Sequence, residues 1–433
     1  MYIEKTNLPS FLNSKFSAPD FYQIEMNYPD SHLPDVEEET RNEILREAQK
    51  IPIQNGETVA IGIGSRGIVN LPEIVRTTCL TLKSLGAKPF IVPAMGSHGN
   101  ATAEGQLDVL QSLGISETSI GCPIRSSMDV VQLGSFSDIP IFFSKDAMEA
   151  DHSICINRIK PHTKFKGTIE SGIVKMMTVG FGKHKGALNY HRWALCFGFS
   201  EMLEETGKII LKNSNFKFGL GIIEDASDKI FKIEGISSNE LFETEANLLK
   251  ISKAHLPGLP VKDIDVLIVQ QIGKEISGAG MDPNVTGRAG DLMEDDFSHI
   301  FKTKRLVVLN LSKGTAGNAL GVGTADVITR KVVDSMDYEK TMTNALTGIS
   351  LQKISIPLVM PTDEKAIQTC FSTIGPIPPE NVRALIIKDT LHLTTFWASQ
   401  ALLAQLQTNP LVQVKEPVKL IFDNEGNLIP GRQ

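Results

Sequence analysis

Short apolar runs alternate with amphipathic stretches along most of the chain. Runs such as Glu57–Gly64 (ETVAIGIG) and KPFIVPAM are short, continuous and apolar, as expected of buried strands. Between them, LPEIVRTTCLTLKSLG has the helical period, with a proline near its start and a glycine after its end. The further strand candidates are DHSICINRI, FKFGLGII, DIDVLIVQQ, KRLVVLNL and RALIIKD. Strands that alternate with helices predict an α/β fold with largely parallel sheets.

The clearest break in this pattern is Lys253–Asp263 (KAHLPGLPVKD), which places two prolines and a glycine between a helical segment and a new strand. We therefore predict two α/β domains, residues 1–257 with the catalytic and cofactor-attaching groups and residues 258–433 closing over them. Because ligands of open α/β folds bind beyond the carboxyl ends of strands and in clefts between domains, we expect the active site in an interdomain cleft.

Composition is that of a cytoplasmic globular protein. Of 433 residues, 41% are hydrophobic and 21% charged, and the net charge of −7 favours neither nucleic acid nor an anionic membrane surface as a partner. No apolar run reaches the roughly 18 residues of a membrane span, and the N-terminus does not have the pattern of a signal peptide. The five cysteines are scattered without a C-x-x-C pair, so we expect reduced thiols rather than disulfides or a zinc site.

One glycine pattern formally matches a dinucleotide-binding motif. Gly62, Gly64 and Gly67 follow a predicted strand with the spacing G-x-G-x-x-G. The next strand does not end in the acidic residue that would hold a ribose, and Ser65 and Arg66 lie where a pyrophosphate turn needs small residues. We therefore expect these glycines to let the strand end turn sharply, with Arg66 either projecting into a cleft to bind a carboxylate or forming a surface ion pair.

Two histidines lie in polar loops after predicted strands. His98, in PAMGSHGNATAEGQ, is placed for proton transfer, because the pKa of histidine lies near neutrality; a loop or capping histidine is the alternative. His162 lies in INRIKPHTKFKGTIESG, a loop with unusually many basic residues for an acidic chain. The cationic residues of this loop are Arg158, Lys160, Lys164 and Lys166. Such a loop indicates an anionic ligand such as a phosphate or carboxylate, unless it is simply solvated.

A lysine among apolar residues marks a third candidate segment, GIVKMMTVGFGKHKGALNYH. Lys175 lies between valine and methionine, so either its stem is buried with the amine at the surface, or its pKa is depressed for bond formation to a carbonyl or acyl group. His184 and His191 follow, but two histidines seven residues apart do not form a recognised metal-binding spacing.

Four features follow one another along the chain: GSRGIVNLPEI, GSHGNATAEGQ, PHTKFKGTIESGIVK, and a histidine 16 residues beyond the lysine of the third. In their order and spacing they resemble the nickel-pincer lactate racemase family. The resemblance implies that Lys175 carries nickel-binding pyridinium-3,5-bisthiocarboxylic acid mononucleotide through a thioamide bond. It also implies that His191 is the protein ligand to nickel, with His184 as a rival of less suitable spacing. His98 and His162 would then be the acid/base pair on the two faces of the substrate.

The same resemblance assigns binding roles to residues around this centre. Arg66, with Ser65 beside it, would hold the substrate carboxylate, and Lys160, Lys164 and Gly172 would help to hold the cofactor. The second domain matches the family weakly, in GKEISGAGMDPNVTGR, where Lys274 and Arg288 are the candidate substrate-binding residues.

The activity implied is that of an isomerase, a 2-hydroxy acid racemase or epimerase that works by reversible hydride transfer through a 2-keto acid. The segment between PH and the lysine is three residues longer than in lactate racemases, so we expect a substrate other than lactate, such as malate or a sugar-derived hydroxy acid. The expected partners are this small anionic substrate and the enzymes that make the cofactor, and a homo-oligomer is left open. Two alternatives stand beside this hypothesis, a metal-dependent dehydratase or hydrolase without the pincer, and a cofactor-free relative that binds a small anion.

Overall fold

The computed structural model describes residues 8–13, 16–290 and 297–429. The chain forms two compact units, which we call the N-terminal unit (Asp30–Leu256) and the C-terminal unit (Pro257–Gln433 with Met1–Pro29). The chain passes from one unit to the other within the proline-containing segment near residue 257, and both units are mixed α/β structures, as the apolar pattern predicted.

The start of the chain does not belong to the unit in which the sequence analysis placed it. Strand β1 (Phe21–Met26) pairs antiparallel with β14 (Thr395–Ser399) and with β15 (Val412–Val418) of the C-terminal unit. Its partners lie almost 400 residues away along the chain, and nothing in the local sequence pattern announces such a pairing.

The N-terminal unit is built on a sheet whose described strands run in the order β3-β2-β6-β7-β8. All neighbouring pairs are parallel except β7 with β8, so four strands end at the same edge of the sheet. The strands of the whole N-terminal unit are β2 (Thr58–Ile63), β3 (Lys88–Pro93), β4 (Val130–Phe136), β5 (Ile139–Ser144), β6 (His152–Arg158), β7 (Phe216–Glu224) and β8 (Ile230–Ser237). Strands β4 and β5 form a separate antiparallel hairpin.

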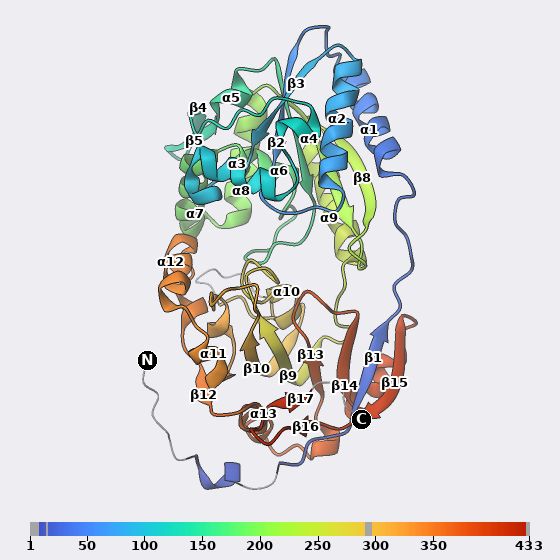
Figure 1. Ribbon diagram of the computed structural model, residues 1–433, viewed down its shortest axis with the longest axis vertical. Helices are drawn as coiled ribbons and strands as arrows, with labels where there is room; N and C mark the ends of the chain where they lie inside the picture. Colours follow the sequence, from blue (N-terminus) through green and yellow to red (C-terminus); the bar gives the residue numbers. More distant parts are fainter. Residues whose placement is uncertain (1–7, 14–15, 291–296, 430–433) are drawn as a thin grey trace. The chain divides into compact units, whose positions relative to one another are not determined.

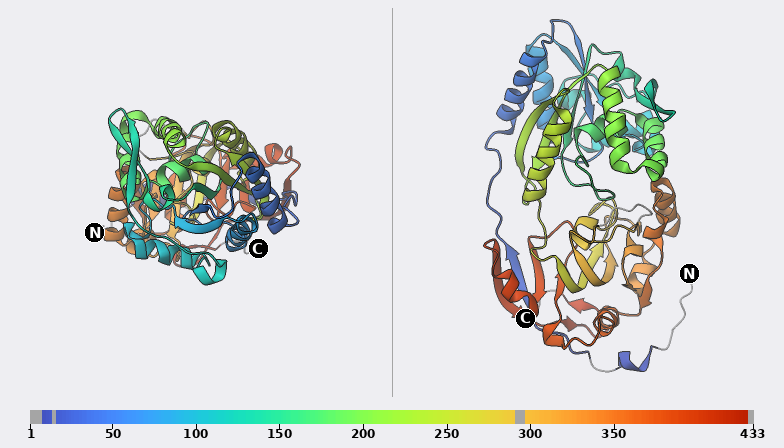
Figure 2. Two further views of the ribbon diagram at one scale, coloured as in Figure 1. Left: turned by 90° about the horizontal axis from the view of Figure 1, so that it is seen from above. Right: turned by 180° about the vertical axis from the view of Figure 1, so that it is seen from behind.

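Helices pack on both faces of this sheet, with α1 and α2 side by side on one of them (Figures 1 and 2). The helices are α1 (Val36–Lys50), α2 (Leu71–Ser84), α3 (Ala103–Ser112), α4 (Glu117–Ile120), α5 (Lys145–Met148), α6 (Ile173–Lys175), α7 (Lys183–Phe197), α8 (Phe199–Asn213) and α9 (Leu241–His255), with a π-helical turn, η3 (Met176–Gly180), after α6. The core between α1, α2 and the sheet consists of aliphatic side chains from the predicted strands, among them Val59, Ile61, Ile154 and Leu220.

The C-terminal unit has a mixed sheet, in which the described strands follow the order β12-β11-β10-β9-β13-β14-β1-β15. The pairs from β12 to β13 are parallel and the remaining ones antiparallel. Its other strands are β9 (Asp263–Ile272), β10 (Lys302–Leu311), β11 (Val327–Thr329), β12 (Leu358–Met360), β13 (Ala384–Ile387), β16 (Ile421–Phe422) and β17 (Leu428–Ile429). Its helices are α10 (Pro283–Thr286), α11 (Arg330–Asp334), α12 (Tyr338–Gly348), α13 (Asp363–Ser372) and α14 (Leu403–Leu406).

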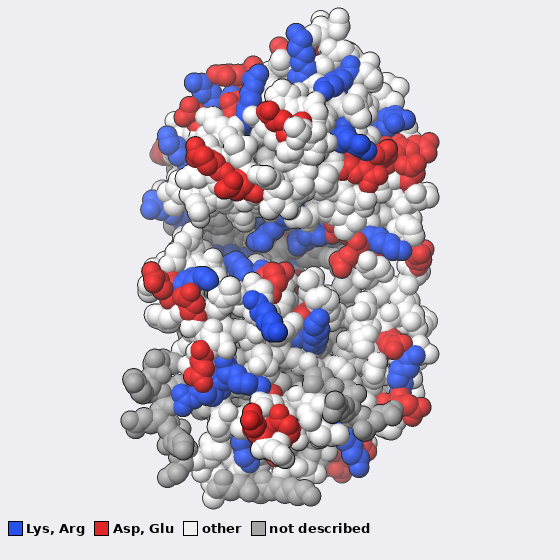
Figure 3. Space-filling view, viewed as in Figure 1, with Lys and Arg blue, Asp and Glu red and all other residues white. Residues whose placement is uncertain are grey.

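Cationic and anionic side chains are intermingled on the face of the molecule seen in Figure 3. This mixture agrees with the modest net charge of −7 and leaves that face without a broad field of one sign.

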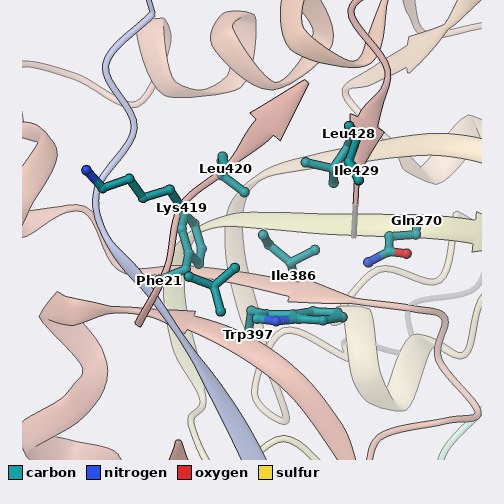
Figure 4. Close-up of a pocket in the computed structure, with 9 residues that line it drawn as sticks. Phe21, Gln270, Ile386, Trp397, Lys419, Leu420, Leu428 and Ile429 are labelled. Atoms are coloured by element: carbon teal, nitrogen blue, oxygen red, sulfur yellow. The ribbon is translucent and has the colours of Figure 1, made fainter. Parts of the chain in front are cut away.

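A small apolar cavity of about 20 Å³ lies in the C-terminal unit (Figure 4). Phe21, Ile386 and Trp397 line it, and the polar side chains of Gln270 and Lys419 lie at opposite ends of the labelled group. It has room for about one water molecule, and none of the predicted site residues lines it.

Candidate active site

The predicted polar residues of the N-terminal unit gather beyond the carboxyl ends of parallel strands. Ser65 and Arg66 follow β2, His98 follows β3, and Lys160 and His162 follow β6. These three strands are neighbours in the sheet and run in the same direction, so their ends share one edge. This is the edge at which open α/β sheets bind ligands.

The segment that carries Lys175 packs directly on two glycines of the G-x-G-x-x-G pattern. A Cβ atom on Gly62 would lie 2.3 Å from the ring of Phe181, and one on Gly64 would lie 2.8 Å from the methyl group of Met176. The sequence alone predicts that these glycines allow a sharp turn. The structure gives another reason for them, since they leave room for η3 and Phe181 against β2.

A buried carboxylate fixes the start of this segment. Glu245 of α9 is 1% exposed, and its Oε2 accepts a hydrogen bond of 2.9 Å from the backbone N–H of Val174. A Cβ atom on Gly172 would lie 2.3 Å from Glu245 Oε1, so this glycine makes room for the carboxylate. Its role in cofactor binding stays a prediction. Burial raises the pKa of Glu245 to about 7, despite the two backbone N–H groups that favour its ionised form.

Lys175 lies against His162, with 2.6 Å between Nζ and Nε2. The backbone N–H of Lys164 donates to Nδ1 of the same ring at 3.1 Å, so Nδ1 carries no proton and the neutral ring carries its proton on Nε2. Nε2–H then donates to Lys175 Nζ, which accepts only as an unprotonated amine. Burial, together with the charges of Lys160 and Arg66, lowers the pKa of Lys175 to about 7, which agrees with this arrangement.

The same surroundings keep His162 neutral. Burial lowers its pKa well below the usual value, and the nearby charges of Lys175, His191, Lys160 and Lys164 act in the same direction. These interactions show that the basic side chains that the sequence scattered over some thirty positions converge on one place.

A buried glutamate holds the basic loop in shape. Glu170 is 1% exposed and accepts a hydrogen bond of 2.6 Å from the backbone N–H of His162. It also forms ion pairs with Lys253 at 2.6 Å and with Lys166 at 3.5 Å. Lys160 and Ser171 close the base of the loop through paired backbone hydrogen bonds. This loop therefore contributes the glutamate that positions the backbone of His162.

His191 has a ring nitrogen suited to a metal. Its Nδ1 is buried without a hydrogen-bond partner among the described residues, and its ring lies 6.0 Å from that of Phe199, centroid to centroid. Burial lowers its pKa to about 4, and the charges of Lys164, Lys175 and His98 add to the effect, so the ring is a neutral imidazole at pH 7. A neutral, otherwise unsatisfied imidazole fits the single protein ligand of a nickel centre. His184, by contrast, is exposed.

Two arginines meet where β2 and β6 end. Loss of hydration among the surrounding groups, followed by the positive charge of Arg158, lowers the pKa of Arg66, although the residue as a whole is exposed at the surface. Buried Glu224 pairs with Arg158 and also accepts a hydrogen bond of 2.9 Å from the backbone N–H of Val69. Glu224 thereby holds both Arg158 and the loop that carries Arg66. The positive charge that remains suits a carboxylate ligand.

Lys183 is a functional candidate that the sequence analysis missed. It is completely buried, and Nζ donates to the carbonyl of Pro93 at 2.7 Å. In the sequence it stands in GKHKGA beside two exposed neighbours, His184 and Lys185, and the helical period does not separate it from them. Its positive φ of 53° is the local feature that turns it inward.

Lys274 and Arg288 lie in the C-terminal unit, each with partners there. Lys274 Nζ donates to the carbonyl of Gly278 and to Asn344 Oδ1, both at 2.8 Å. Asn344 lines an open hollow of about 460 Å³ beside α12. Arg288 pairs with Asp326 at 2.8 Å and donates to backbone carbonyls, which is a structural use of the guanidinium. Their substrate-binding roles stay predictions.

Within the described ranges, no three His, Cys, Asp or Glu side chains gather as a metal bound by protein groups alone requires. A site with one histidine and donors from an organic cofactor lies outside that pattern. All five cysteines are free thiols, as predicted. No helix in the described part of the chain is both long and apolar enough to cross a membrane.

Comparison with known proteins gives a likeness in structure only. No family model and no curated protein matches the sequence. A protein from Thermotoga maritima aligns with a TM-score of 0.51 and 12% identity over 83% of this chain and 98% of its own. The lactate racemase apoprotein from Thermoanaerobacterium thermosaccharolyticum aligns with a TM-score of 0.50 and 15% identity over 86% of this chain and 99% of its own. The chain has a lactate racemase-like fold. At these identities the likeness establishes the fold and leaves the activity to the site itself.

Proposed function

We propose that this chain is a racemase or epimerase of a 2-hydroxy acid that carries a nickel-pincer nucleotide on Lys175. One observation carries the proposal: the buried amine of Lys175 contacts His162 at 2.6 Å, in a cluster that also contains His191 with an unsatisfied ring nitrogen. The pKa of Lys175, lowered to about 7, agrees with this arrangement. The structural likeness to a lactate racemase supports the class of reaction.

Lys175 and His191 would hold the cofactor. An amine with a pKa of about 7 is available for an N–C bond at neutral pH, whereas an ordinary lysine is almost fully protonated. His191 would supply a neutral nitrogen to nickel, whose other donors come from the pincer. When bound, the group supplies a hydride acceptor for the α-hydrogen of the substrate. The charges of Lys160 and Lys164 would favour its phosphate.

His162 and His98 would move the hydroxyl proton. Once Lys175 is acylated its nitrogen is a poor acceptor, so Nε2–H of His162 is released from this contact. Nε2 of His162 would then face the substrate as one site of proton transfer, and His98 would be the other. To give up a proton His162 must first become an imidazolium, and to take one its Nε2 must be free of hydrogen, so both roles require the ring to leave the resting tautomer set by the N–H of Lys164. A pair of groups that exchange these roles allows the hydroxyl proton to be lost on one face and returned on the other.

Arg66 would hold the carboxylate of the substrate. It lies at the end of β2 beside Arg158, and no anionic partner of Arg66 is found among the described residues, whereas Arg158 is paired with Glu224. A planar guanidinium binds a carboxylate through two parallel hydrogen bonds and so fixes the orientation of the α-carbon. This orientation is what a reaction on either face of one carbon requires.

The test is a racemisation assay on a panel of enantiopure 2-hydroxy acids, including lactate, malate and aldonic acids. The protein should be produced in a host that makes the pincer nucleotide, and the reaction followed by chiral chromatography in D2O. Racemisation with retention of the α-protium is expected, because hydride transfer does not pass through solvent. Incorporation of deuterium would indicate direct deprotonation, and no turnover on any substrate by cofactor-loaded protein would refute the proposal.

A further inference from the structure

Lys183 occupies an unusual place for a charged side chain. It is 0% exposed, lies directly after the segment that carries Lys175, and has a left-handed backbone with φ of 53°. Its Nζ donates to the carbonyl of Pro93, at the end of β3, at 2.7 Å, and to Oε1 of Gln106 in α3 at 3.4 Å. A buried ammonium group is costly unless hydrogen bonds satisfy it. These two hydrogen bonds satisfy the ammonium group of Lys183 and join it to β3 and α3.

Gln106 extends this connection to the histidine loop. It is also 0% exposed, and its Nε2 donates to the carbonyl of Gly96 at 3.0 Å and to that of His98 at 3.3 Å. Both polar ends of one buried amide are therefore used, with its oxygen toward Lys183 and its nitrogen toward the main chain on either side of position 97.

A second link runs between the same two segments. The backbone N–H of Gly96 donates to the carbonyl of Gly180, the last residue of η3, at 3.1 Å. At Gly99, φ is +64° and a Cβ atom would lie 2.4 Å from the backbone of Gly105, so the loop is closely packed on α3. The main chain around His98 is thus tied to the Lys175 segment directly and through the Lys183–Gln106 pair.

We propose that Lys183 and Gln106 are positioning residues, which fix the main chain at His98 relative to the segment that carries Lys175. The inference rests on the proposed function for the catalytic meaning of His98, but the positioning itself can be measured without turnover. Two aliphatic side chains in place of Lys183 and Gln106 would fill the same space without the cost of burying an ammonium group. They would also remove the N–H donors of Gln106 that bind the carbonyls of the His98 loop. The pair therefore has a use beyond filling the core.

Two substitutions separate the parts of the network. Gln106→Glu keeps an oxygen facing Lys183 but removes the N–H donors to the loop carbonyls. Lys183→Met keeps the length of the side chain and removes the ammonium group that orients the amide. Thr78→Val is the control, since Thr78 is equally buried and its hydroxyl bonds to the carbonyl of Ile74 in its own helix.

Hydrogen exchange of residues 94–102, followed by mass spectrometry on the unmodified chain, measures the positioning. We expect exchange in this loop to be about tenfold faster in both variants, since each loses a buried hydrogen bond, and unchanged in Thr78→Val. Unaltered loop exchange in folded Lys183→Met would overturn the inference. Faster exchange throughout the N-terminal unit would also overturn it, because it would mark an ordinary core residue.

The kinetic measurement uses cofactor-loaded protein. If wild type racemises a hydroxy acid, Gln106→Glu should lower kcat about tenfold or more with KM nearly unchanged. A tenfold rise in KM with kcat unchanged would contradict the positioning of His98. If wild type racemises nothing, the proposed function fails, and the exchange measurement still decides whether the pair holds the loop.

Discussion

The lowered pKa of Lys175 leads to a quantitative prediction about chemical labelling. Cyanate reacts only with neutral amines and is small enough to enter a half-buried site. An ordinary lysine, with a pKa of about 10.4, has roughly 4 × 10⁻⁴ of its population as neutral amine at pH 7. With a pKa of about 7, Lys175 has about half. Its share of reactive amine is therefore about a thousandfold larger.

The observed advantage in rate will be smaller than this ratio, because a less basic amine is a weaker nucleophile and burial slows the approach of the reagent. We expect carbamoylation of Lys175 to exceed that of the exposed Lys262 by roughly tenfold or more at pH 7. Peptide mapping by mass spectrometry gives both rates from one sample.

The pH profile tests the lowered pKa independently of access. The reagent reacts as isocyanic acid, so the rates are compared as the ratio of Lys175 to Lys262, in which the pH dependence of the reagent cancels. This ratio should be roughly constant below pH 7 and fall by about tenfold for each pH unit from about pH 8 to 9, because the neutral fraction of Lys175 saturates while that of an ordinary lysine still rises. Lys160→Met removes a positive charge that lowers the pKa of Lys175, so the pH midpoint of labelling at Lys175 should move upward. Lys250→Met on α9 serves as the control. A Lys175 to Lys262 ratio that stays constant through pH 9 would refute the assignment.

Three further predictions follow from the other groups around the site. His191→Ala should abolish nickel retention, measured by elemental analysis, while His184→Ala retains it; equal loss in both would remove His191 as the ligand. Glu245 has a folded pKa of about 7 against about 4.5 unfolded, so it binds a proton more readily when folded and stability should fall by about 3 kcal/mol as pH rises from 4.5 to 7. In urea unfolding, Glu245→Gln should lack this fall in stability with pH. The same pH dependence of the free energy of unfolding in wild type and variant would contradict the raised pKa of Glu245. Gly62→Ala should cost about 1–3 kcal/mol by forcing a Cβ atom into a phenyl ring, whereas Gly67→Ala, where the nearest atom lies at 3.8 Å, should be nearly neutral in thermal unfolding.

The apolar runs were sufficient to predict seven of the strands (β2, β3, β6, β7, β9, β10 and β13) and, through the α/β rule, the edge at which the candidate residues lie. Arg66, His98 and His162 each follow a strand, and parallel strands bring their carboxyl ends together regardless of the distance along the chain. The segment around Lys175 was predicted as a candidate because its apolar neighbours are visible in the sequence. These inferences need only local pattern and one topological rule.

The remaining features depend on contacts between distant positions. Glu245 caps the Lys175 segment from 70 residues away, and Lys183 reaches Pro93 across 90 positions. Neither contact has a sequence period, since each depends on where helices lie after the sheet has formed. The membership of β1 in the C-terminal unit follows from strand pairing across most of the chain, for the same reason.

We propose that Lys175 carries a nickel-binding cofactor. The most direct measurement is intact-protein mass spectrometry with elemental analysis, on wild type and Lys175→Ala produced together with a complete pincer-biosynthesis pathway. We expect a mass increase that maps to Lys175, with about one nickel per chain for a single square-planar site, and neither of the two in Lys175→Ala. An unmodified, nickel-free wild-type chain, in a host that fully loads an established lactate racemase, would contradict it.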